Sequence, residues 1–289
     1  MKLIHRGVLI TGSNRGLGKA IARACVAEGA DVLLGARNID SLEPVVAELR
    51  ELAGASRRIL TAALDTCNAG AVEEVVKRAA AELPNFNGLV NNAGIWGAKG
   101  AIEEVDLQTW RQTIEVNLFG PLYTCHSAVP LFRKQGYGKI VNLSGGGATS
   151  PMPRLSAYAA SKAAVVRFTE TLAGEVRDAG IDVNAVAPGA LNTAMLDEIL
   201  AAGPQVVGEY YERALKQKES GGASLERAAA LCVHLLSAES DGITGRLISA
   251  VWDPWERLGE LRQPLEASDV YTLRRITPED RGFDWGQKA

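Results

Sequence analysis

The chain has 289 residues, 47% of them hydrophobic and 22% charged, which is ordinary for a globular protein of one large or two small domains. A net charge of −3 gives no reason to expect nucleic acid or an acidic membrane as a partner, and no apolar run approaches a membrane span. The four cysteines and three histidines are scattered, without a C-x-x-C pair, and residues 1–6 do not resemble a signal peptide. We therefore expect a cytoplasmic protein without a metal site or a disulfide framework.

Short apolar runs alternate with longer helical patterns along the chain. Gly29 and Gly180 lie where helix C-caps are expected, and Ser224 where an N-cap is expected. Nearly continuous apolar strands joined by helices predict an α/β fold, a doubly wound (Rossmann) parallel sheet of about seven strands with helices on both faces. The predicted strands contain residues 8–10, 32–34, 59–60, 89–90, 140–143, 183–186 and, more weakly, 247–248; the predicted helices cover 17–28, 41–53, 69–82, 107–133, 157–178 and 224–237.

We predict one domain over residues 1–251. Residues 190–222 form an insertion after the sixth strand, with helical character and Gly-Pro at 203–204. Residues 252–289 form a C-terminal extension rich in aromatic residues, prolines and charges. The extension either packs on its own domain or a neighbouring subunit, or closes over a substrate.

A glycine cluster lies between the first strand and the first helix. Glycines allow a tight turn and a close approach to a pyrophosphate, while the helix N-terminus supplies N–H groups and a partial positive charge. The position of the cluster makes it more specific than its composition alone. We expect these residues to hold the phosphates of a dinucleotide: Gly12, Asn14, Arg15, Gly16, Leu17 and Gly18.

The end of the second strand indicates which dinucleotide fits. A site for NAD usually places an acidic residue there, against the ribose 2′-hydroxyl. Here the sequence is Leu34-Gly35-Ala36-Arg37-Asn38, and Arg15 in the cluster adds a second cation. Two guanidinium groups can pair with a 2′-phosphate, although both arginines could also be solvated surface residues. The sequence therefore predicts NADP(H) in preference to NAD(H).

Tyr158 and Lys162 lie four residues apart, so a helix would place both side chains on one face. A free tyrosine has a pKa of about 10 and exchanges protons poorly at neutral pH. A lysine cation close to it favours the phenolate and lowers that pKa. The spacing alone is common on helix surfaces, and it gains significance from the other motifs.

With the glycine cluster, Asn91-Asn92-Ala93-Gly94 after the fourth strand and Tyr158-x-x-x-Lys162, the sequence resembles the short-chain dehydrogenase/reductase family, in its compact single-domain branch, over roughly residues 7–250. The resemblance implies hydride transfer between a nicotinamide cofactor and a carbonyl or secondary alcohol substrate, with Tyr158 as acid/base. Lys162 would hold the nicotinamide ribose and lower the pKa of the tyrosine. It also implies a homodimer or homotetramer. The remaining cofactor contacts that it implies are Asp65 at the adenine, Asn91, Ala93 and Gly94 along the cofactor, and Pro188, Gly189 and Thr193 at the nicotinamide end.

Asn117 matches an asparagine that the family carries in a helix. Pro121, four residues later, has no N–H for the carbonyl of residue 117. That carbonyl could accept a hydrogen bond from a water that relays protons, and we expect the helix to kink there. Alternatively, the helix ends near Gly120-Pro121.

Gly145 departs from the family pattern, which has a serine thirteen residues before the tyrosine to bind the substrate oxygen. Ser144 lies one residue earlier, and adjacent residues of a strand point in opposite directions. Three interpretations remain: Ser144 turns in through the flexible Gly145-Gly146-Gly147; Thr149, Ser150 or the substrate's own hydroxyl serves instead; or the site only binds nucleotide.

The substrate wall is expected to be apolar, formed by Trp96, Met152, Leu155, Leu191 and Met195, with Arg154 either binding a substrate anion or solvated. We expect an NADP(H)-dependent carbonyl reductase or alcohol dehydrogenase. The alternatives are an NADP(H)-binding sensor or scaffold with a degenerate site, and an NAD-dependent sugar or polyol dehydrogenase.

Overall fold

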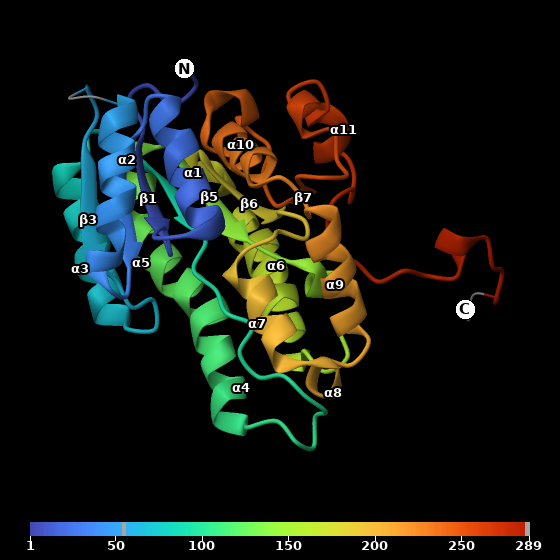
Figure 1. Ribbon diagram of the computed structural model, residues 1–289. Coiled ribbons are helices and arrows are strands. Elements are labelled where there is room, and N and C mark those ends of the chain that lie inside the picture. Colours follow the sequence, from blue (N-terminus) through green and yellow to red (C-terminus); the bar gives the residue numbers. More distant parts are fainter. Residues whose placement is uncertain (54–55, 287–289) are drawn as a thin grey trace.

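A sheet of seven parallel strands forms the centre of the computed structural model, which describes residues 1–53 and 56–286 (Figure 1). The strand order is β3-β2-β1-β4-β5-β6-β7. The predicted doubly wound sheet is thus confirmed, including the weak seventh strand. The strands are β1 (Gly7–Thr11), β2 (Asp31–Ala36), β3 (Ile59–Ala63), β4 (Phe86–Asn91), β5 (Gly138–Leu143), β6 (Ile181–Ala187) and β7 (Leu247–Ser249).

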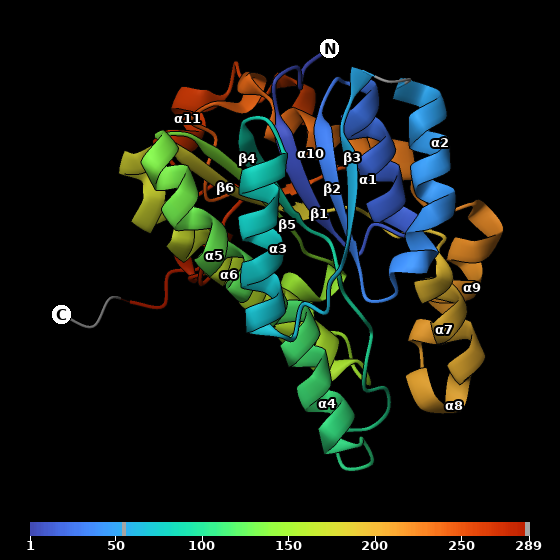
Figure 2. The ribbon, with the colours of Figure 1, turned by 90° about the vertical axis from the view of Figure 1, so that its left-hand side faces the viewer.

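Helices cover both faces of the sheet, because successive buried side chains of each strand point to opposite sides. In β1, Val8 and Ile10 face one core while Leu9 faces the other. The first face carries α1 (Gly16–Ala27), α2 (Glu43–Ala53) and α10 (Leu225–Leu236), and the second α3 (Ala69–Glu82), α5 (Gly120–Gln135) and α6 (Ser156–Val176) (Figure 2).

The helix caps form as the sequence predicts. The hydroxyl of Ser224 accepts a hydrogen bond from the Arg227 N–H at 3.1 Å, at the start of α10. Gly180 follows α6 and its short 3₁₀ continuation with φ of 68°, in the left-handed region that favours glycine.

β2 lies on one side of β1 and β4 on the other, so the direction in which successive strands are added to the sheet reverses at β1. The connections that leave the carboxyl ends of these strands diverge to opposite faces of the sheet, which opens a crevice at that edge. The glycine cluster after β1 lies at this crevice.

The predicted helix over 107–133 forms without a break, but its winding changes in the middle. It consists of α4 (Leu107–Ile114), a π-helical turn over Glu115–Phe119 and then α5. The Gly120 N–H bonds to the carbonyl of Glu115, five residues back. Pro121 cannot donate to the carbonyl of Asn117, so the change in winding occurs where the missing N–H predicted a distortion. The helix therefore does not end near Gly120-Pro121.

The insertion 190–222 forms α7 (Ala194–Ala202), α8 (Pro204–Val207) and α9 (Tyr210–Ser220), which stand together beside the carboxyl edge of the sheet (Figure 1). Leu196, Ile199 and Val207 pack in one apolar cluster with Trp96 and Tyr158. The insertion thus forms part of the wall around the tyrosine.

The C-terminal extension packs on its own domain. Trp255, Leu258 and Leu265, the last in α11 (Arg262–Glu266), are buried in the same core as α1 and α10. The buried guanidinium of Arg246 donates to the carbonyls of residues 265, 268 and 270. The Leu247 N–H donates to the Tyr271 carbonyl at 2.8 Å, which covers the outer edge of β7. Beyond residue 274 the chain leads away from the body of the protein (Figure 1).

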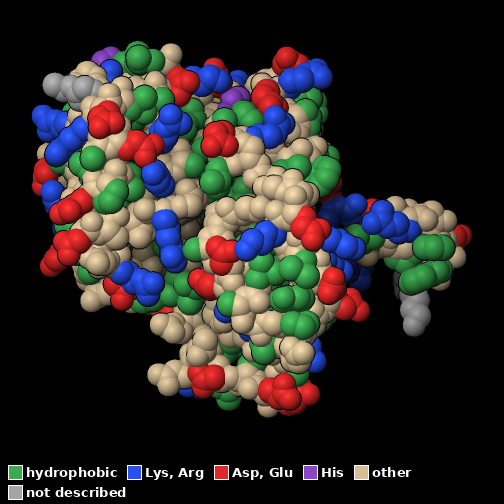
Figure 3. All heavy atoms as spheres, in the orientation of Figure 1, with side chains coloured by type: hydrophobic (Ala, Val, Ile, Leu, Met, Phe, Trp, Pro, Cys, Tyr) green, Lys and Arg blue, Asp and Glu red, His purple; other side chains and the backbone are tan. Residues whose placement is uncertain are grey.

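Acidic and basic side chains are interspersed over the face of the molecule shown in Figure 3. Within residues 1–53 and 56–286, no helix is both long and apolar enough to cross a membrane. All four cysteines are free, and Cys25, Cys125 and Cys232 are buried.

Candidate active site

One cavity of about 1490 Å³ runs along the carboxyl edge of the sheet. It extends from Arg37 and Asp65 at the end of β2 and β3 to Tyr158 and Lys162 on α6. The cofactor contacts expected from the sequence that line it are Gly12, Asn14, Arg15, Gly16, Leu17, Gly18, Arg37, Asp65, Ala93, Gly94, Tyr158, Lys162, Pro188, Gly189 and Thr193.

The turn between β1 and α1, residues 12–18, is called the glycine turn. It leaves room for a ligand because Gly12 and Gly18 have no side chains. A β-carbon on Gly18 would lie 2.2 Å from the Gly12 carbonyl oxygen, and one on Gly12, which has φ of 63°, would lie 2.9 Å from the Ala93 Cα. Only glycine fits at either position. The turn leads into the N-terminus of α1, whose free N–H groups suit an anion, so the residues present fit the pyrophosphate of a dinucleotide.

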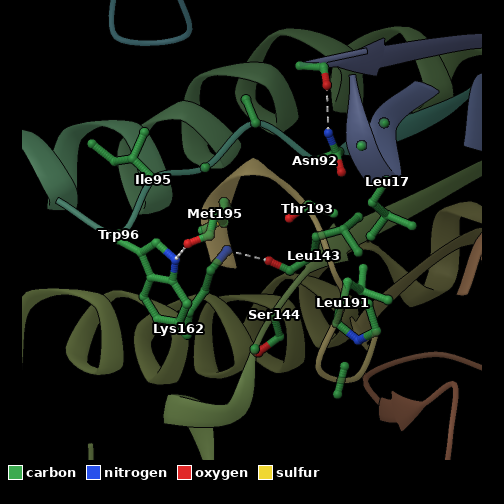
Figure 4. A pocket seen from close by; sticks show the side chains of 18 of the residues that line it. Leu17, Asn92, Ile95, Trp96, Leu143, Ser144, Lys162, Leu191, Thr193 and Met195 are labelled. Carbon is green, nitrogen blue, oxygen red and sulfur yellow. Dashed lines mark hydrogen bonds between the residues drawn. The ribbon is translucent and has the colours of Figure 1, made fainter. Parts of the chain in front are cut away.

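Asn92, which sequence reasoning did not assign, fixes the glycine turn against β4. Its amide donates to the carbonyls of Thr11 at 3.0 Å and Gly12 at 2.9 Å. The Thr11 hydroxyl accepts from the Asn92 and Ala93 N–H groups, both at 3.0 Å. The sequence shows two adjacent asparagines, Asn91 and Asn92. Which of them reaches the turn depends on the side of the sheet to which each side chain points, and Figure 4 shows Asn92.

Asn91 was expected to line the cofactor and does not line the cavity. Its side chain faces the interior, where it donates to the Asn142 amide oxygen at 2.8 Å and accepts from the Thr124 hydroxyl at 2.6 Å. It therefore joins β4 to β5 and α5.

Arg15 and Arg37 are exposed at the cavity, and neither forms a hydrogen bond or an ion pair through its side chain with any residue in the described part of the chain. No carboxylate lies at the end of β2, where the sequence is Ala36-Arg37-Asn38. This end of the cavity carries two cations available for an anionic group.

Tyr158 and Lys162 lie one helical turn apart on α6, both buried and both lining the cavity. The Lys162 Nζ donates to the Leu143 carbonyl at 2.8 Å and lies 5.7 Å from the tyrosine ring centroid (Figure 4). Burial lowers the pKa of Lys162 to about 8. Burial, with a smaller contribution from Tyr210, raises the pKa of Tyr158. The lowering of this pKa by Lys162 stays a prediction.

Trp96 covers the ring of Tyr158. The two ring centroids lie 4.1 Å apart, and the Trp96 indole N–H donates to the Met195 carbonyl at 2.8 Å (Figure 4). Tyr210 on α9 also contacts the indole, in an edge-to-face arrangement with centroids 5.7 Å apart. Trp96 was expected in the substrate wall, but its contact with the tyrosine is not predictable from local sequence, because the two residues come from distant segments.

Gly145 lies directly beneath the tyrosine hydroxyl. A β-carbon at Gly145 would lie 2.3 Å from the Tyr158 Oη, so the phenol occupies the space into which a serine side chain would project. Ser144 also lines the cavity; it is 4% exposed, and its hydroxyl has no hydrogen-bond partner among the described residues. Thr149 lines the cavity as well, whereas Ser150 does not.

Asn117 does not line the cavity, and its side chain clamps the loop that carries Trp96. It accepts from the Ile95 N–H and donates to the Ile95 carbonyl, both at 2.9 Å. Its amide also donates to the Ser161 hydroxyl at 3.0 Å, next to Lys162. The water relay through its main-chain carbonyl stays a prediction.

Arg154 is not in the cavity wall. Its guanidinium donates to the carbonyls of Gln205 at 2.9 Å and Val206 at 3.3 Å. It joins its loop to α8, and the expectation that it could bind a substrate anion has no support in this geometry.

A family model described as short chain dehydrogenase matches residues 6–203. The chain belongs to the short-chain dehydrogenase/reductase family. Its members are oxidoreductases that act on alcohol and carbonyl groups with a nicotinamide cofactor, and the residues of the glycine turn fit such a cofactor.

Relatives that are named for different substrates are similar to this chain at comparable sequence identity. It is 33% identical to the 2-dehydro-3-deoxy-L-rhamnonate dehydrogenase (NAD(+)) of a Sphingomonas species, over 81% of this chain and 89% of the relative. It is also 33% identical to the 3-oxoacyl-[acyl-carrier-protein] reductase of Thermotoga maritima, over 86% and 97%. The crystal structure of levodione reductase superposes with a TM-score of 0.79 at 28% identity, covering 86% of this chain and 96% of that one.

Proposed function

We propose that this dehydrogenase/reductase prefers NADP(H) to NAD(H) and transfers a hydride between nicotinamide and a carbonyl or secondary alcohol group, with Tyr158 as acid/base. The observation that carries the proposal is a single cavity that brings Arg15 and Arg37 together with Tyr158 and Lys162. The substrate is a small molecule. The family resemblance further supports a homodimer or homotetramer.

The cations at the end of β2 support the preference for NADP(H). A 2′-phosphate would pair with the exposed guanidinium groups of Arg15 and Arg37, while Asp65 would contact the adenine. The N–H groups at the glycine turn would hold the pyrophosphate. Pro188, Gly189 and Thr193 would border the nicotinamide end. When bound, the cofactor supplies or accepts the hydride.

Tyr158 can exchange a proton with the substrate oxygen in either direction of the reaction. A phenol that stays protonated at neutral pH can donate its proton to a carbonyl oxygen, and in the reverse direction the same group takes the proton from an alcohol. Lys162 would hold the nicotinamide ribose. The Asn117 carbonyl would contribute to proton exchange with solvent through water.

Two alternatives have specific support. The relative named for NAD(+) and a sugar acid supports an NAD-dependent sugar or polyol dehydrogenase. The absence of a serine at Gly145 supports an NADP(H)-binding sensor or scaffold without turnover.

The affinities for NADPH and NADH test whether the protein prefers NADP(H) to NAD(H). NADPH and NADH affinities would be measured by fluorescence titration for the wild type, Arg37→Ala and a control, Arg50→Ala, in which an exposed arginine on α2 is removed. We expect Arg37→Ala to weaken NADPH binding about 10- to 100-fold and NADH binding hardly at all, because a charge-assisted hydrogen bond is lost. Equal losses for both nucleotides would contradict the preference for NADP(H).

Turnover tests the chemistry. Ketones and secondary alcohols would be screened with NADPH and NADP, and Tyr158→Phe compared with the wild type on every substrate that reacts. Loss of the acid/base group should lower kcat by roughly 10²- to 10⁴-fold with unchanged NADPH affinity. Turnover unaffected by Tyr158→Phe would refute the assigned mechanism, and nucleotide binding without turnover on any substrate would favour the sensor.

A further inference from the structure

The C-terminal extension forms part of the wall of the same cavity that contains Tyr158. Trp252, Asp253, Tyr271 and Thr272 all line it, next to the carboxyl end of β7. Two interactions hold these residues in place. The Leu247 N–H donates to the Tyr271 carbonyl at 2.8 Å, and the Asp253 Oδ2 accepts from the Ser249 N–H at 2.7 Å.

Asp253 is a half-buried carboxylate without a cation. It forms no ion pair with any described residue, and its Oδ1 accepts no hydrogen bond from them. Burial raises its pKa, with no opposing contribution from a positive side chain. A partly desolvated carboxylate gains from a nearby hydrogen-bond donor or cation. This one faces a cavity, where a ligand can provide the partner.

Burial raises the pKa of Tyr271, and the nearby Asp253 carboxylate adds a smaller contribution in the same direction. The tyrosine hydroxyl makes no hydrogen bond to a described residue. Its backbone has φ of 63°, in the left-handed region that a tyrosine rarely adopts, while its carbonyl is held by β7. The exposed indole of Trp252 lies at the rim of the same part of the cavity.

The cavity wall also includes Gly146, from the loop that follows β5. No atom lies within 4 Å of the position that its β-carbon would occupy. The cations that line the cavity are Arg15 and Arg37 at the phosphate end and Lys162, whose Nζ donates to the Leu143 carbonyl. Asp253 is thus the charged group on the wall formed by the extension.

We propose that Asp253 and Tyr271 form a second substrate subsite, which binds a hydrogen-bond donor, a hydroxyl or an ammonium group, at the end of the substrate away from the reacting carbonyl. The proposal rests on the proposed oxidoreductase function and adds to it a substrate class: neutral or cationic carbonyl compounds with a remote donor. Acidic substrates are disfavoured, because Asp253 would repel a second carboxylate.

Binding to the NADP-loaded protein tests the subsite independently of turnover. Four alcohols on one ring serve as probes: cyclohexanol, trans-1,4-cyclohexanediol, trans-4-aminocyclohexanol and trans-4-hydroxycyclohexanecarboxylate. Calorimetry should give affinities about tenfold higher for the diol and the amino alcohol than for cyclohexanol, with the carboxylate weakest. Comparing the diol with the amino alcohol distinguishes a hydroxyl donor from an ammonium donor.

Variants assign the preference to the carboxylate. Asp253→Asn keeps an acceptor for the Ser249 N–H and should reduce the preference for the amino alcohol, whereas Asp253→Leu should remove the preference for both donors. Glu260→Gln, an exposed carboxylate of the extension outside the cavity wall, is the matched control. NADPH affinity and thermal melting establish that each variant is folded.

Equal affinities across the four probes, a preference that survives Asp253→Leu, or no binding of the diol and the amino alcohol would each overturn the subsite. Failure of the proposed function has a different signature, because it shows as turnover insensitive to Tyr158→Phe or as absent turnover, whatever the probe affinities.

Discussion

The hydroxyl oxygen of Tyr158 lies 2.3 Å from the point where a β-carbon on Gly145 would stand. Gly145 itself has φ of −177°, extended backbone that any residue can adopt, so the need for glycine here is purely steric. The indole of Trp96 also contacts the phenol ring, with centroids 4.1 Å apart and ring planes at 44°. The glycine at residue 145 and the tryptophan contact both help to define the space that the tyrosine occupies.

Restoring the serine should harm this protein. Gly145→Ser places a β-carbon against the tyrosine hydroxyl, and overpacking of this kind costs about 1–3 kcal/mol of unfolding free energy. Urea denaturation measures the loss, with Gly146→Ser as a control because its β-carbon meets open space. In Trp96→Ala the ring can move away, so the double variant should lose less than the sum of the two single variants. Strict additivity would show that the two positions are independent.

The buried hydroxyl of Ser144 lines the cavity and lacks a partner among the described residues, so we propose Ser144 as the group that holds the substrate oxygen. If it does so, Ser144→Ala should lower kcat about 10²- to 10³-fold while NADPH affinity stays unchanged. Thr149→Val, at the exposed threonine of the same cavity, should have little effect. The opposite ranking of the two variants in steady-state kinetics would assign the role to Thr149.

Lys162 is expected to cost stability in exchange for function. Its pKa falls from 10.5 to about 8 on folding, so the unfolded state binds the proton more tightly and the unfolding free energy should rise with pH between about 8 and 10.5. Lys162→Met should therefore stabilise the protein at pH 7 by about 1–3 kcal/mol, after loss of the bond to the Leu143 carbonyl, and reduce kcat strongly. Lys216→Met on the surface of α9 is the control, and a destabilised Lys162→Met would contradict the expectation.

His234 should make the protein less stable in mild acid. Burial lowers its pKa below 6.5, and its Nε2 has no hydrogen-bond partner among the described residues while Nδ1 lies 3.1 Å from Glu239. The unfolded state takes up a proton as pH falls through 6.5 and the folded state does not, so the unfolding free energy should fall in that window. His234→Leu should flatten the dependence between about pH 7.5 and 5.5 in denaturant titrations, and His126→Leu at an exposed site should not. Identical slopes for the wild type and His234→Leu would refute this.

Features that depend on neighbouring residues in the sequence could be predicted. The strands, the glycine turn and the cap at Ser224 follow from local spacing, and Pro121 indicated the distortion of its helix because a missing N–H acts within one turn. The spacing of Tyr158 and Lys162 likewise placed both in one cavity.

What could not be predicted depends on distant segments meeting. Nothing in the local sequence shows that Trp96 contacts Tyr158, or that the Asn117 amide clamps Ile95 from 22 residues away. The direction of the Tyr158 pKa also follows from burial, which is a property of the folded chain.

The anchoring of the extension has a consequence for how the chain is made. Trp255, Leu258 and Leu265 complete a core to which β1 and α1 contribute the first side chains. The ribosome synthesises the chain from its N-terminus. All seven strands therefore emerge before Trp255, Leu258 and Leu265, which pack in the same core as α10. The core on this face of the sheet therefore stays open on one side until residues 255–265 have emerged, and its packing cannot be completed before they do.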